Sequence, residues 1–388
     1  MKILFISDNA INGFGGGSIE NRKHYDALKK YCEKYGDELK VISRDKDIEG
    51  SLGIQIQKNR LIDVLVRIQG HSTYLYATWK KNEKAIYAYK PDMIYLGRSR
   101  FGFIAQSIKR KLPKCKVITN IDNVEVDYID GYFSLKRGFI NKLYRSLEMQ
   151  AVKCDEFQAI EFSDALVYLT KRNVLRIKEI YGHTEQMPVV LPICLEEEIQ
   201  LTKTSKRRTV VFIGSLDYAA NVLAVQRILG LWKKHNLEKE NVELLIAGRN
   251  PSKRLVEDIN KLENIQLVQN FESASSIIPQ NSLMLAPIEK GAGMKVKVAE
   301  TLSMGLMIAA SDEALVGYEE ALQEDGGNGI IRANTDAEFL ECIKSYLSKT
   351  NTDLKKIEID NKKLFRKYYN YETSRKAVED ICNSLLKR

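Results

Sequence analysis

Gly293, Lys297 and Glu300 have the residue types and the spacing of a site that could hold a nucleotide. They are separated by four and three residues, so in a helix they share one face. The axial rise from Gly293 to Glu300 is about 10 Å, comparable to the span from a diphosphate to the ribose of a nucleotide. This geometry predicts phosphates and a lysine at the helix N-terminus, and a carboxylate two turns further on that accepts both ribose hydroxyls. The alternative is a Lys297–Glu300 surface ion pair, which leaves the glycines unexplained.

The flanking sequence predicts the elements that position these residues. Residues 283–286 form an apolar run typical of a buried strand, and glycines at 291 and 293 indicate a loop. The pattern that follows predicts a helix over 294–304 that ends at Gly305. A strand, a glycine loop and a helix would thus carry the candidate nucleotide site.

A second glycine segment, residues 12–18, lies between the first predicted strand and the first predicted helix. Gly16 and Gly17 would let the backbone approach a ligand closely and leave N–H groups of the helix start facing an anion. The spacing is not the dinucleotide fingerprint, and a packing role for these glycines is the alternative. His24 follows on the same helix, where we expect a surface residue.

The whole chain alternates short apolar runs with longer amphipathic stretches, which is typical of parallel sheets with helices between the strands. In the first half the strand-like runs are 3–6, 39–43, 93–96, 117–121 and 166–169, and a helix is expected over 19–35. The alternation restarts with runs at 209–213, 244–247, 265–268, 283–286 and 306–309. The sequence therefore predicts an α/β protein with two domains in tandem.

The domain boundary is expected in a polar stretch without apolar periodicity. We place the first domain at residues 1–195, a linker at 196–207 and the start of the second domain at residue 208. A chain of 388 residues with 44% hydrophobic and 29% charged residues has ample material for two cores.

Charge is divided unevenly between the two halves. Residues 1–195 hold 32 Lys+Arg against 23 Asp+Glu, and residues 196–388 hold 28 of each, so the whole net charge of +9 lies in the first half. This half should face something negative, either an anionic membrane surface or a phosphorylated acceptor. No nucleic-acid motif accompanies the basic clusters, and a solvated lysine-rich surface is the alternative.

Six scattered cysteines with no metal-ligand or redox spacing favour a reducing compartment. The N-terminal apolar run is too short for a signal peptide, and no stretch approaches the length of a membrane span. These features predict a cytoplasmic protein, or one on the inner membrane face. Asp45 and Asp47 form an Asp-x-Asp, a pattern that binds metal elsewhere, but their polar flanks favour a solvated loop.

An ordered set of motifs resembles the retaining GT-B glycosyltransferases of family 4. The matching pieces run through nearly the whole second domain: 214–221, 245–249, 291–300, 308–311 and 316–318. In the first domain the likeness is confined to the glycine loop and to residues 122–125. Residues 363–388, with Tyr368 to Tyr371, resemble the C-terminal helix of the family, which crosses back to the first domain, and the second domain would then end at 362.

The resemblance implies two Rossmann-like domains with parallel sheets that face a central cleft. It implies a UDP- or GDP-sugar donor held by the second domain, a glycan or lipid-linked acceptor held by the first, and neither cofactor nor metal. The residues that would contact the donor are Gly16, Gly17, Gly214, Ser215, Asn221, Arg249, Gly293, Met294, Lys295, Lys297 and Glu300. Lys295 and Lys297 are candidates for catalysis, because cationic groups stabilise a leaving diphosphate. Asp122 is the third candidate.

Three departures from the family leave alternatives open. Ala292 stands where a glutamate often contacts the donor sugar, and Asp122 stands where a histidine is frequent. The basic pair often found after the glycine of the second domain's first strand is absent, since Ser215 and the region of Ala220 and Asn221 replace it. Asp122 could hydrogen-bond a sugar hydroxyl or orient the acceptor, or it could be a structural turn residue. These departures motivate a second hypothesis, a catalytically inactive partner or stabiliser of an active transferase. A third, a sugar-nucleotide epimerase, lacks a convincing acid/base pair.

Residues 135–153 predict a basic amphipathic helix. Phe139, Ile140, Leu143, Tyr144 and Leu147 lie largely along one side, with Lys136, Arg137, Lys142 and Arg145 outside it. Such a helix could lie on anionic lipid, where a lipid-linked acceptor would be found. Packing of the apolar stripe into a core is the alternative.

Overall fold

The computed structural model describes residues 1–13, 16–45, 47–54, 56, 60–133, 138–182, 186, 188–291 and 293–387. The chain divides into two compact units. Unit 1 comprises Met1–Cys194 together with Tyr371–Arg388, and unit 2 comprises Leu195–Asn370. The last helix of the chain therefore belongs to the same unit as the first strand.

Unit 1 is built on a six-stranded parallel sheet of order β2-β1-β3-β4-β5-β6. Its strands are β1 (Lys2–Ile6), β2 (Glu38–Ile42), β3 (Met93–Leu96), β4 (Lys116–Ile121), β5 (Ala165–Tyr168) and β6 (Pro188–Val190). Every residue of β3 and β5 is buried. Central strands with helices on both faces have no solvent side, which explains their continuous apolar runs.

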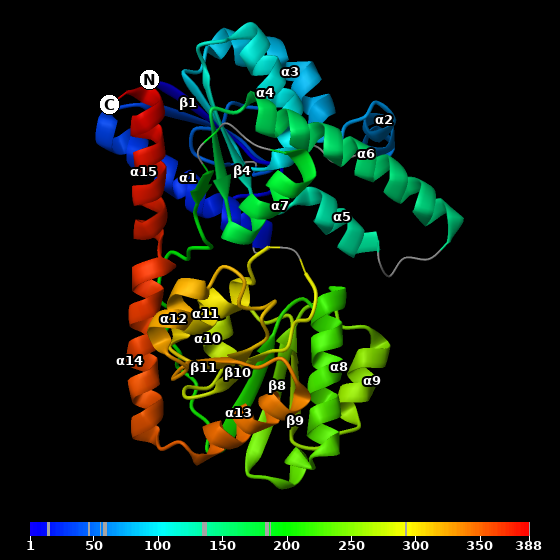
Figure 1. Ribbon diagram of the computed structural model, residues 1–388, viewed down its shortest axis with the longest axis vertical. Helices are drawn as coiled ribbons and strands as arrows, with labels where there is room; N and C mark the ends of the chain where they lie inside the picture. The colour runs from blue at the N-terminus through cyan, green and yellow to red at the C-terminus, as the bar shows by residue number, and fades with distance from the viewer. Residues whose placement is uncertain are drawn as a thin grey trace. The chain divides into compact units, whose positions relative to one another are not determined.

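The helices of unit 1 connect these strands and cover the sheet. They are α1 (Gly16–Tyr35), α2 (Arg60–Ile68), α3 (Leu75–Tyr89), the short 3-10 turn η1 (Ser99–Phe101), α4 (Gly102–Lys111), α5 (Glu125–Phe133), α6 (Phe139–Phe162), α7 (Lys171–Tyr181) and α15 (Tyr371–Leu386). Helix α15 lies beside α1 (Figure 1), where Arg375 pairs with Asp26 at 2.7 Å and Val378 and Cys382 join a core cluster with Leu28.

Unit 2 is built on a second six-stranded parallel sheet, of order β12-β11-β10-β7-β8-β9. Its strands are β7 (Arg208–Ile213), β8 (Val242–Gly248), β9 (Ile265–Gln269), β10 (Leu283–Ala286), β11 (Met307–Ala310) and β12 (Ile330–Arg332). Its helices are α8 (Ala219–Lys234), η2 (Leu237–Lys239), α9 (Lys253–Asn260), α10 (Ala274–Ile277), α11 (Val296–Met304), α12 (Glu319–Asp325), α13 (Asp336–Ser348) and α14 (Asn351–Tyr368). Helix α14 packs against α11 and α12 (Figure 1).

The predicted alternation of strands and helices agrees with both units, with two strands missed. β6 and β12 are three-residue strands at sheet edges, too short to show an apolar run. The segment 363–388, expected as one helix, is divided between α14 and α15, with the break at residues 369–370. The helix expected over 135–153 forms part of α6, while Lys136 and Arg137 lie outside the described residues. Among the described helices, none combines the length and the apolar character needed to cross a membrane.

Helix α4 approaches α6 closely at its first residue. A Cβ built on Gly102 would lie 1.8 Å from the Asp155 carbonyl oxygen and 2.4 Å from the Ala159 amide nitrogen. Both are backbone atoms of α6, so they cannot turn away as a side chain would. Gly102 therefore permits the contact between the two helices.

Gly102→Ala should destabilise unit 1 by about 1–3 kcal/mol, because the new methyl group must push two packed helices apart. Urea unfolding followed by circular dichroism gives the change. Gly131→Ala is the control, since Gly131 lies in α5, where an added Cβ would meet nothing within 4 Å, and this variant should be neutral or slightly stabilised. Equal unfolding midpoints for the two variants would contradict the close approach.

Candidate functional site: the glycine corner and helix α11 of unit 2

The ends of β7 and β8 form a tight corner in unit 2. A Cβ on Gly248 would lie 2.0 Å from the Gly214 carbonyl oxygen, and a Cβ on Gly214 would lie 2.8 Å from the Asn221 amide nitrogen. Asn221, on the first turn of α8, donates from this amide to the Ser215 carbonyl at 3.0 Å. Three predicted donor-site residues, Gly214, Ser215 and Asn221, are thus held together at the carboxyl ends of the strands, where ligands bind in open α/β sheets.

The loop before α11 departs from the expected geometry. The helix begins at Val296 with Lys295 as N-cap residue, not at residue 294. Gly293 has a φ of 64°, a left-handed conformation that a right-handed helix does not contain. The expectation that Gly293 shares a helix face with Lys297 and Glu300 is therefore wrong, and only the latter two are on the helix. Gly293 and Met294 are both buried in the loop that leads to it.

Lys297 is the central charged group of this site. Its ammonium donates to Asn221 Oδ1 at 2.9 Å and lies over the Phe212 ring, 4.0 Å from the centroid. The side chain is only 9% exposed. Burial lowers the pKa of Lys297 to about 7, although the nearby Glu300 carboxylate acts in the opposite direction. Because a nearby negative charge favours the protonated form, Lys297 would become fully charged when an anion binds beside it.

Glu300 lies one turn further along α11 and is half-buried. Burial raises its pKa, and Lys297 offsets part of that rise. Within the described part of the chain, its carboxylate takes no hydrogen bond and no ion pair closer than 4 Å. The alternative of a surface Lys297–Glu300 ion pair is therefore wrong: the lysine is buried and bound to Asn221. The two oxygens of Glu300 are free to accept hydroxyl donors.

Lys295 is held differently from Lys297. Its ammonium donates to the Gly293 carbonyl at 2.7 Å and pairs with Glu313 Oε1 at 3.0 Å, while its own carbonyl accepts from the Tyr318 hydroxyl at 2.9 Å. Lys295 therefore closes the loop that precedes the helix. A ligand phosphate that contacts Lys295 would therefore share the lysine ammonium with Glu313.

The remaining donor candidates are distributed over both units. In unit 2, Arg249 follows β8 in an exposed loop, and its carbonyl accepts from Leu216 N at 2.8 Å, which fixes the glycine corner. In unit 1, Gly16 and Gly17 form the first turn of α1, where a Cβ on Gly17 would meet the Asn9 side chain at 2.7 Å. Ala292 and Gly15 lie outside the described residues.

Asp122 belongs to a buried polar cluster at the carboxyl edge of the unit 1 sheet. Asp8, Arg98 and Asp122 follow the adjacent strands β1, β3 and β4. Arg98 Nη1 lies 3.8 Å from Asp8 Oδ1, and its Nε lies 3.7 Å from Asp122 Oδ2. Asp8 Oδ1 and Arg98 Nε are buried without a hydrogen-bond partner in the described residues. Polar atoms left in this state at a strand edge are typical of a ligand site.

The pKa values of the carboxylates Asp122 and Glu125 are shifted in opposite directions. Burial raises the pKa of Asp122 to about 7, because the cost of burying its charge outweighs the attraction of Arg98. Burial would also raise the pKa of Glu125, but the guanidiniums of Arg100, at 2.7 Å, and Arg98, at 2.9 Å, lower it. Sequence reasoning missed Asp8 and Arg98. A charged residue just after a buried strand was the signal available for both.

One expectation for unit 1 is wrong. His24 is fully buried, not at the surface: its Nδ1 lies 2.7 Å from the Tyr95 hydroxyl and its Nε2 3.1 Å from Glu20. Asp45 is a partly exposed loop residue, and its carboxylate accepts from the backbone of Ile11 at 2.6 Å and of Asn12 at 3.2 Å. Asp47 is exposed. In the described ranges, no three His, Cys, Asp or Glu side chains are grouped so that they could hold a metal ion.

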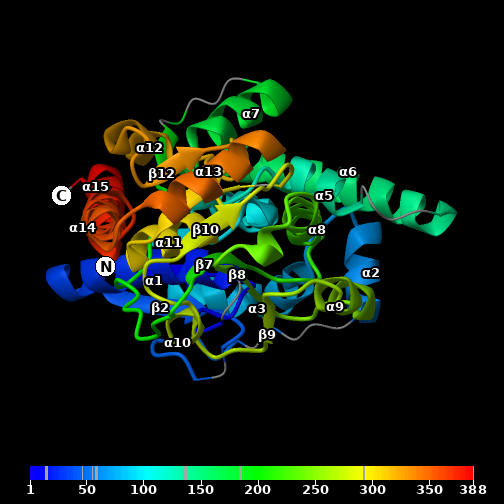
Figure 2. The same cartoon turned by 90° about the horizontal axis from the view of Figure 1, so that it is seen from below.

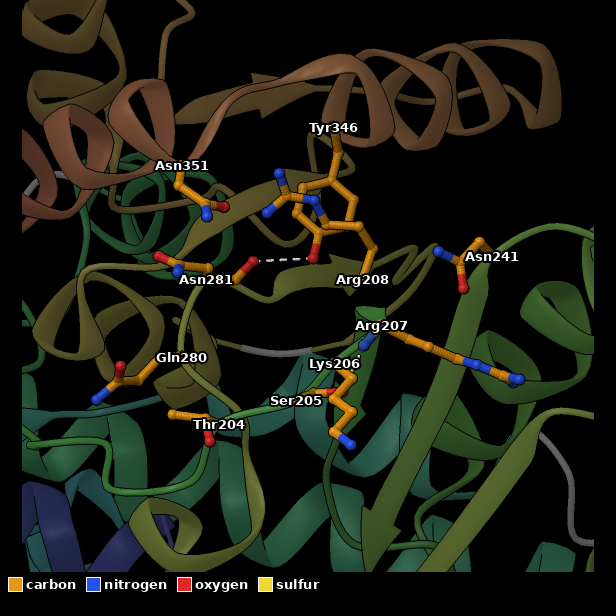
Figure 3. Close-up of a pocket in the computed structure, with 10 residues that line it drawn as sticks. All are labelled: Thr204, Ser205, Lys206, Arg207, Arg208, Asn241, Gln280, Asn281, Tyr346 and Asn351. Atoms are coloured by element: carbon orange, nitrogen blue, oxygen red, sulfur yellow. Dashed lines mark hydrogen bonds between the residues drawn. The ribbon is translucent and has the colours of Figure 1, made fainter.

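A pocket of about 420 Å³ lies at the opposite edge of the unit 2 sheet (Figure 3). Arg208 begins β7 and Asn281 precedes β10, so the pocket is at the amino ends of the strands. The Tyr346 hydroxyl donates to the Asn281 carbonyl at 2.8 Å, and the Arg208 guanidinium lies over the Tyr346 ring (Figure 3). None of the predicted site residues lines this pocket.

Comparison with solved structures identifies the architecture. A glycosyltransferase from Rickettsia africae superposes with a TM-score of 0.68 at 15% identity, covering 100% of this chain and 99% of that one. WaaG, a glycosyltransferase involved in lipopolysaccharide biosynthesis, gives 0.68 at 12% identity over 98% and 99%. Anabaena HepE in complex with UDP gives 0.61 at 14% identity over 99% and 100%. The fold is therefore GT-B, the glycosyltransferase architecture of two Rossmann-like domains.

Sequence comparison adds a partial match to a family. Residues 207–349, most of unit 2, match the family described as glycosyl transferases group 1. This match covers less than half of the chain. A protein of Klebsiella pneumoniae, described as an uncharacterized 44.6 kDa protein in cps region, is 23% identical over 251 residues. This match spans 62% of the present chain and 61% of the Klebsiella protein.

Lys297→Met should remove a pH-dependent part of the stability of unit 2. Lysine in an unfolded chain titrates near pH 10.4, whereas folded Lys297 titrates at about 7. Below about pH 7 both states are protonated, and the folded state bears the full cost of burying the ammonium. Between these values only the unfolded chain holds the proton, so the free energy of unfolding rises with pH.

Urea unfolding of the two proteins from about pH 6 to about pH 10 measures this effect. The difference in unfolding free energy, wild type minus Lys297→Met, should increase across the window. The control is Lys290→Met, at an exposed lysine in the loop before α11, and it should follow the wild type. A difference that stays constant with pH would show that Lys297 is not buried as an ammonium.

Proposed function

We propose that the protein is a retaining, metal-independent glycosyltransferase of family 4 that moves a sugar from a UDP- or GDP-sugar to a glycan or lipid-linked acceptor. The observation that carries the proposal is Lys297, a buried ammonium held by Asn221 at the glycine corner, with the Glu300 carboxylate on the next turn. The helix N-terminus and the lysine suit a diphosphate, and the carboxylate suits a ribose. The product belongs to a surface polysaccharide or glycoconjugate.

The chemistry that this site would perform is the departure of a nucleoside diphosphate. The bond between the anomeric carbon and the diphosphate oxygen breaks, the acceptor oxygen bonds to that carbon, and the acceptor proton leaves. Negative charge accumulates on the departing diphosphate, where Lys297 and the first amides of α11 stabilise it. Lys295 adds charge at the same helix start while Glu313 keeps it in place. These cations would perform the role that a metal ion has in other transferases.

The acceptor would bind to the polar cluster of unit 1. Asp8 and Asp122 can accept hydrogen bonds from sugar hydroxyls and Arg98 can donate them, so the set suits a neutral polyol. This assignment explains why the buried atoms Asp8 Oδ1 and Arg98 Nε have no hydrogen-bond partner in the described residues. We infer that Asp122 orients the acceptor hydroxyl rather than serving as a turn residue, since its hydrogen bond to the next amide leaves Oδ2 toward Arg98.

The structures similar to this chain support the donor class and the product class. Anabaena HepE was solved with UDP, with UDP and glucose, and with UDP-glucose. WaaG takes part in lipopolysaccharide biosynthesis. We therefore place UDP-sugars first among the donors to test, and propose that the protein acts in the cytoplasm or on the inner face of the membrane.

Thermal unfolding with UDP, GDP, ADP and their sugars, each with and without EDTA, tests the donor assignment. One nucleotide should raise the melting temperature equally in both conditions; at a hundred times its Kd it adds about 2.7 kcal/mol of stability. Glu300→Ala should weaken the binding of that nucleotide by about 1.5–3 kcal/mol, because charge-assisted hydrogen bonds to the ribose are lost. Glu289→Ala, which removes an exposed carboxylate from the loop before α11, should leave binding unchanged.

Two outcomes would contradict this assignment. If no nucleotide shifts the transition, the protein is better described as a catalytically inactive partner of another transferase. If Glu300→Ala and Glu289→Ala bind the nucleotide equally well, the ribose is held elsewhere. The anomeric configuration of the product, followed by NMR, decides between retention and inversion.

Asp122→Asn should lower transfer without changing donor binding, since Asp122 is not among the residues expected to contact the donor. The pKa of Asp122 is raised to about 7, so its carboxylate is protonated below that pH and ionised above it. Acceptor kcat/KM of the wild type should therefore rise with pH through about 7, and the rise should be absent in Asp122→Asn. A loss of UDP affinity in the variant, or an unchanged pH profile, would rule out this role for Asp122.

A further inference from the structure

Exposed apolar side chains of unit 1 are concentrated on two helices. On α2, Leu61 is 76% exposed, and Ile62, Val64, Leu65 and Ile68 are exposed as well. On the first third of α6, Phe139 is 81% and Ile140 82% exposed, with Leu143 and Leu147 also in solvent. Isolated exposed leucines are ordinary, but nine large apolar side chains on two short helical segments are not.

The spacing shows that these side chains form stripes. Residues 61, 64, 65 and 68 of α2 follow the i, i+3, i+4, i+7 pattern of one helix face. The opposite face of α2 is the one that holds it in the fold, through buried Val66 and the partly buried Arg67. Core packing, the alternative for the apolar stripe of α6, accounts for Tyr144 but not for the four exposed residues.

The two stripes belong to neighbouring helices. Arg67 of α2 pairs with Glu148 of α6, and its guanidinium lies 5.8 Å from the centre of the Tyr144 ring. Both views show α2 beside α6 (Figures 1 and 2). We name the exposed apolar residues of α2 and of the start of α6 the α2–α6 face.

The segment of the chain that contains the α2–α6 face is basic, and this charge indicates what could cover the face. Residues 58–153, which include both helices, hold 19 Lys+Arg against 8 Asp+Glu, whereas residues 1–57 hold 9 of each. Lys142 and Lys153 of α6 lie at least partly in solvent. A second copy of the chain would bring two such basic regions together, which is unfavourable. An anionic surface with an apolar interior complements both the charge and the stripes.

We propose that the α2–α6 face docks unit 1 on an anionic lipid bilayer. The apolar stripes enter the boundary between headgroups and acyl chains, and the lysines outside them contact the headgroups. Lipid binding of this kind requires neither donor nor acceptor, so the proposal stands apart from the proposed transferase activity. If that activity is also present, docking brings the polar cluster of unit 1 to the surface where a lipid-linked acceptor resides.

Co-sedimentation with vesicles tests the proposal. The wild type should pellet with vesicles of phosphatidylcholine and phosphatidylglycerol, and pellet little with phosphatidylcholine alone or at high salt. The double variant Leu61→Gln, Ile140→Gln should bind the anionic vesicles about tenfold or more weakly, because two apolar side chains no longer enter the bilayer. The matched control is Leu175→Gln, Leu223→Gln, at exposed leucines on α7 and α8.

Three results would overturn the proposal. In the first, the wild type does not bind anionic vesicles. In the second, the two double variants lose vesicle binding equally. In the third, the wild type sediments as a dimer and only the Leu61→Gln, Ile140→Gln variant sediments as a monomer. Circular dichroism and the thermal shift with UDP show whether each variant is folded and whether unit 2 is intact. A protein that binds vesicles but no nucleotide would contradict the proposed function and leave the docking surface standing.

Discussion

The buried ammonium of Lys297 is the constraint on which the chemistry of unit 2 depends. A charge removed from water must be compensated, and here the compensation comes from the side-chain oxygen of Asn221 at 2.9 Å and the face of Phe212. Asn221 is in turn tied to the Ser215 carbonyl, and the glycines at 214 and 248 leave room for it. Burial lowers the pKa of this lysine, and an anion bound beside it would favour its charged form.

In unit 1, buried charges are compensated by ion pairs. Glu125 is shared by Arg98 and Arg100, Arg100 continues to Glu148 at 2.8 Å, and Glu148 is shared with Arg67. This run of ion pairs extends from the strand edge, where Asp122 lies, to helices α6 and α2. Breaking one member would leave a buried charge without its partner, which is costly. The proposed acceptor cluster and the proposed docking face thus share one structural support.

Local patterns in the sequence determined most of the fold. Ten apolar runs corresponded to strands because central parallel strands are buried on both sides and cannot alternate with polar residues. Gly305 ended α11 as expected, since its φ of 71° is a left-handed helix cap. The three-residue strands β6 and β12 were missed because an edge strand can be held by a few backbone bonds without an apolar signature.

Only the tertiary structure decided the environment of each side chain, because burial depends on segments far apart in the chain. A surface ion pair was the alternative for Lys297 and Glu300 in the sequence, yet Asn221, 76 positions away, accepts a hydrogen bond from the lysine. His24 was expected in solvent and is buried against Tyr95. Phe139 and Ile140 could have entered a core, yet no element covers them among the described residues. Residue type and spacing set the candidates, and three-dimensional packing set their charge, partners and exposure.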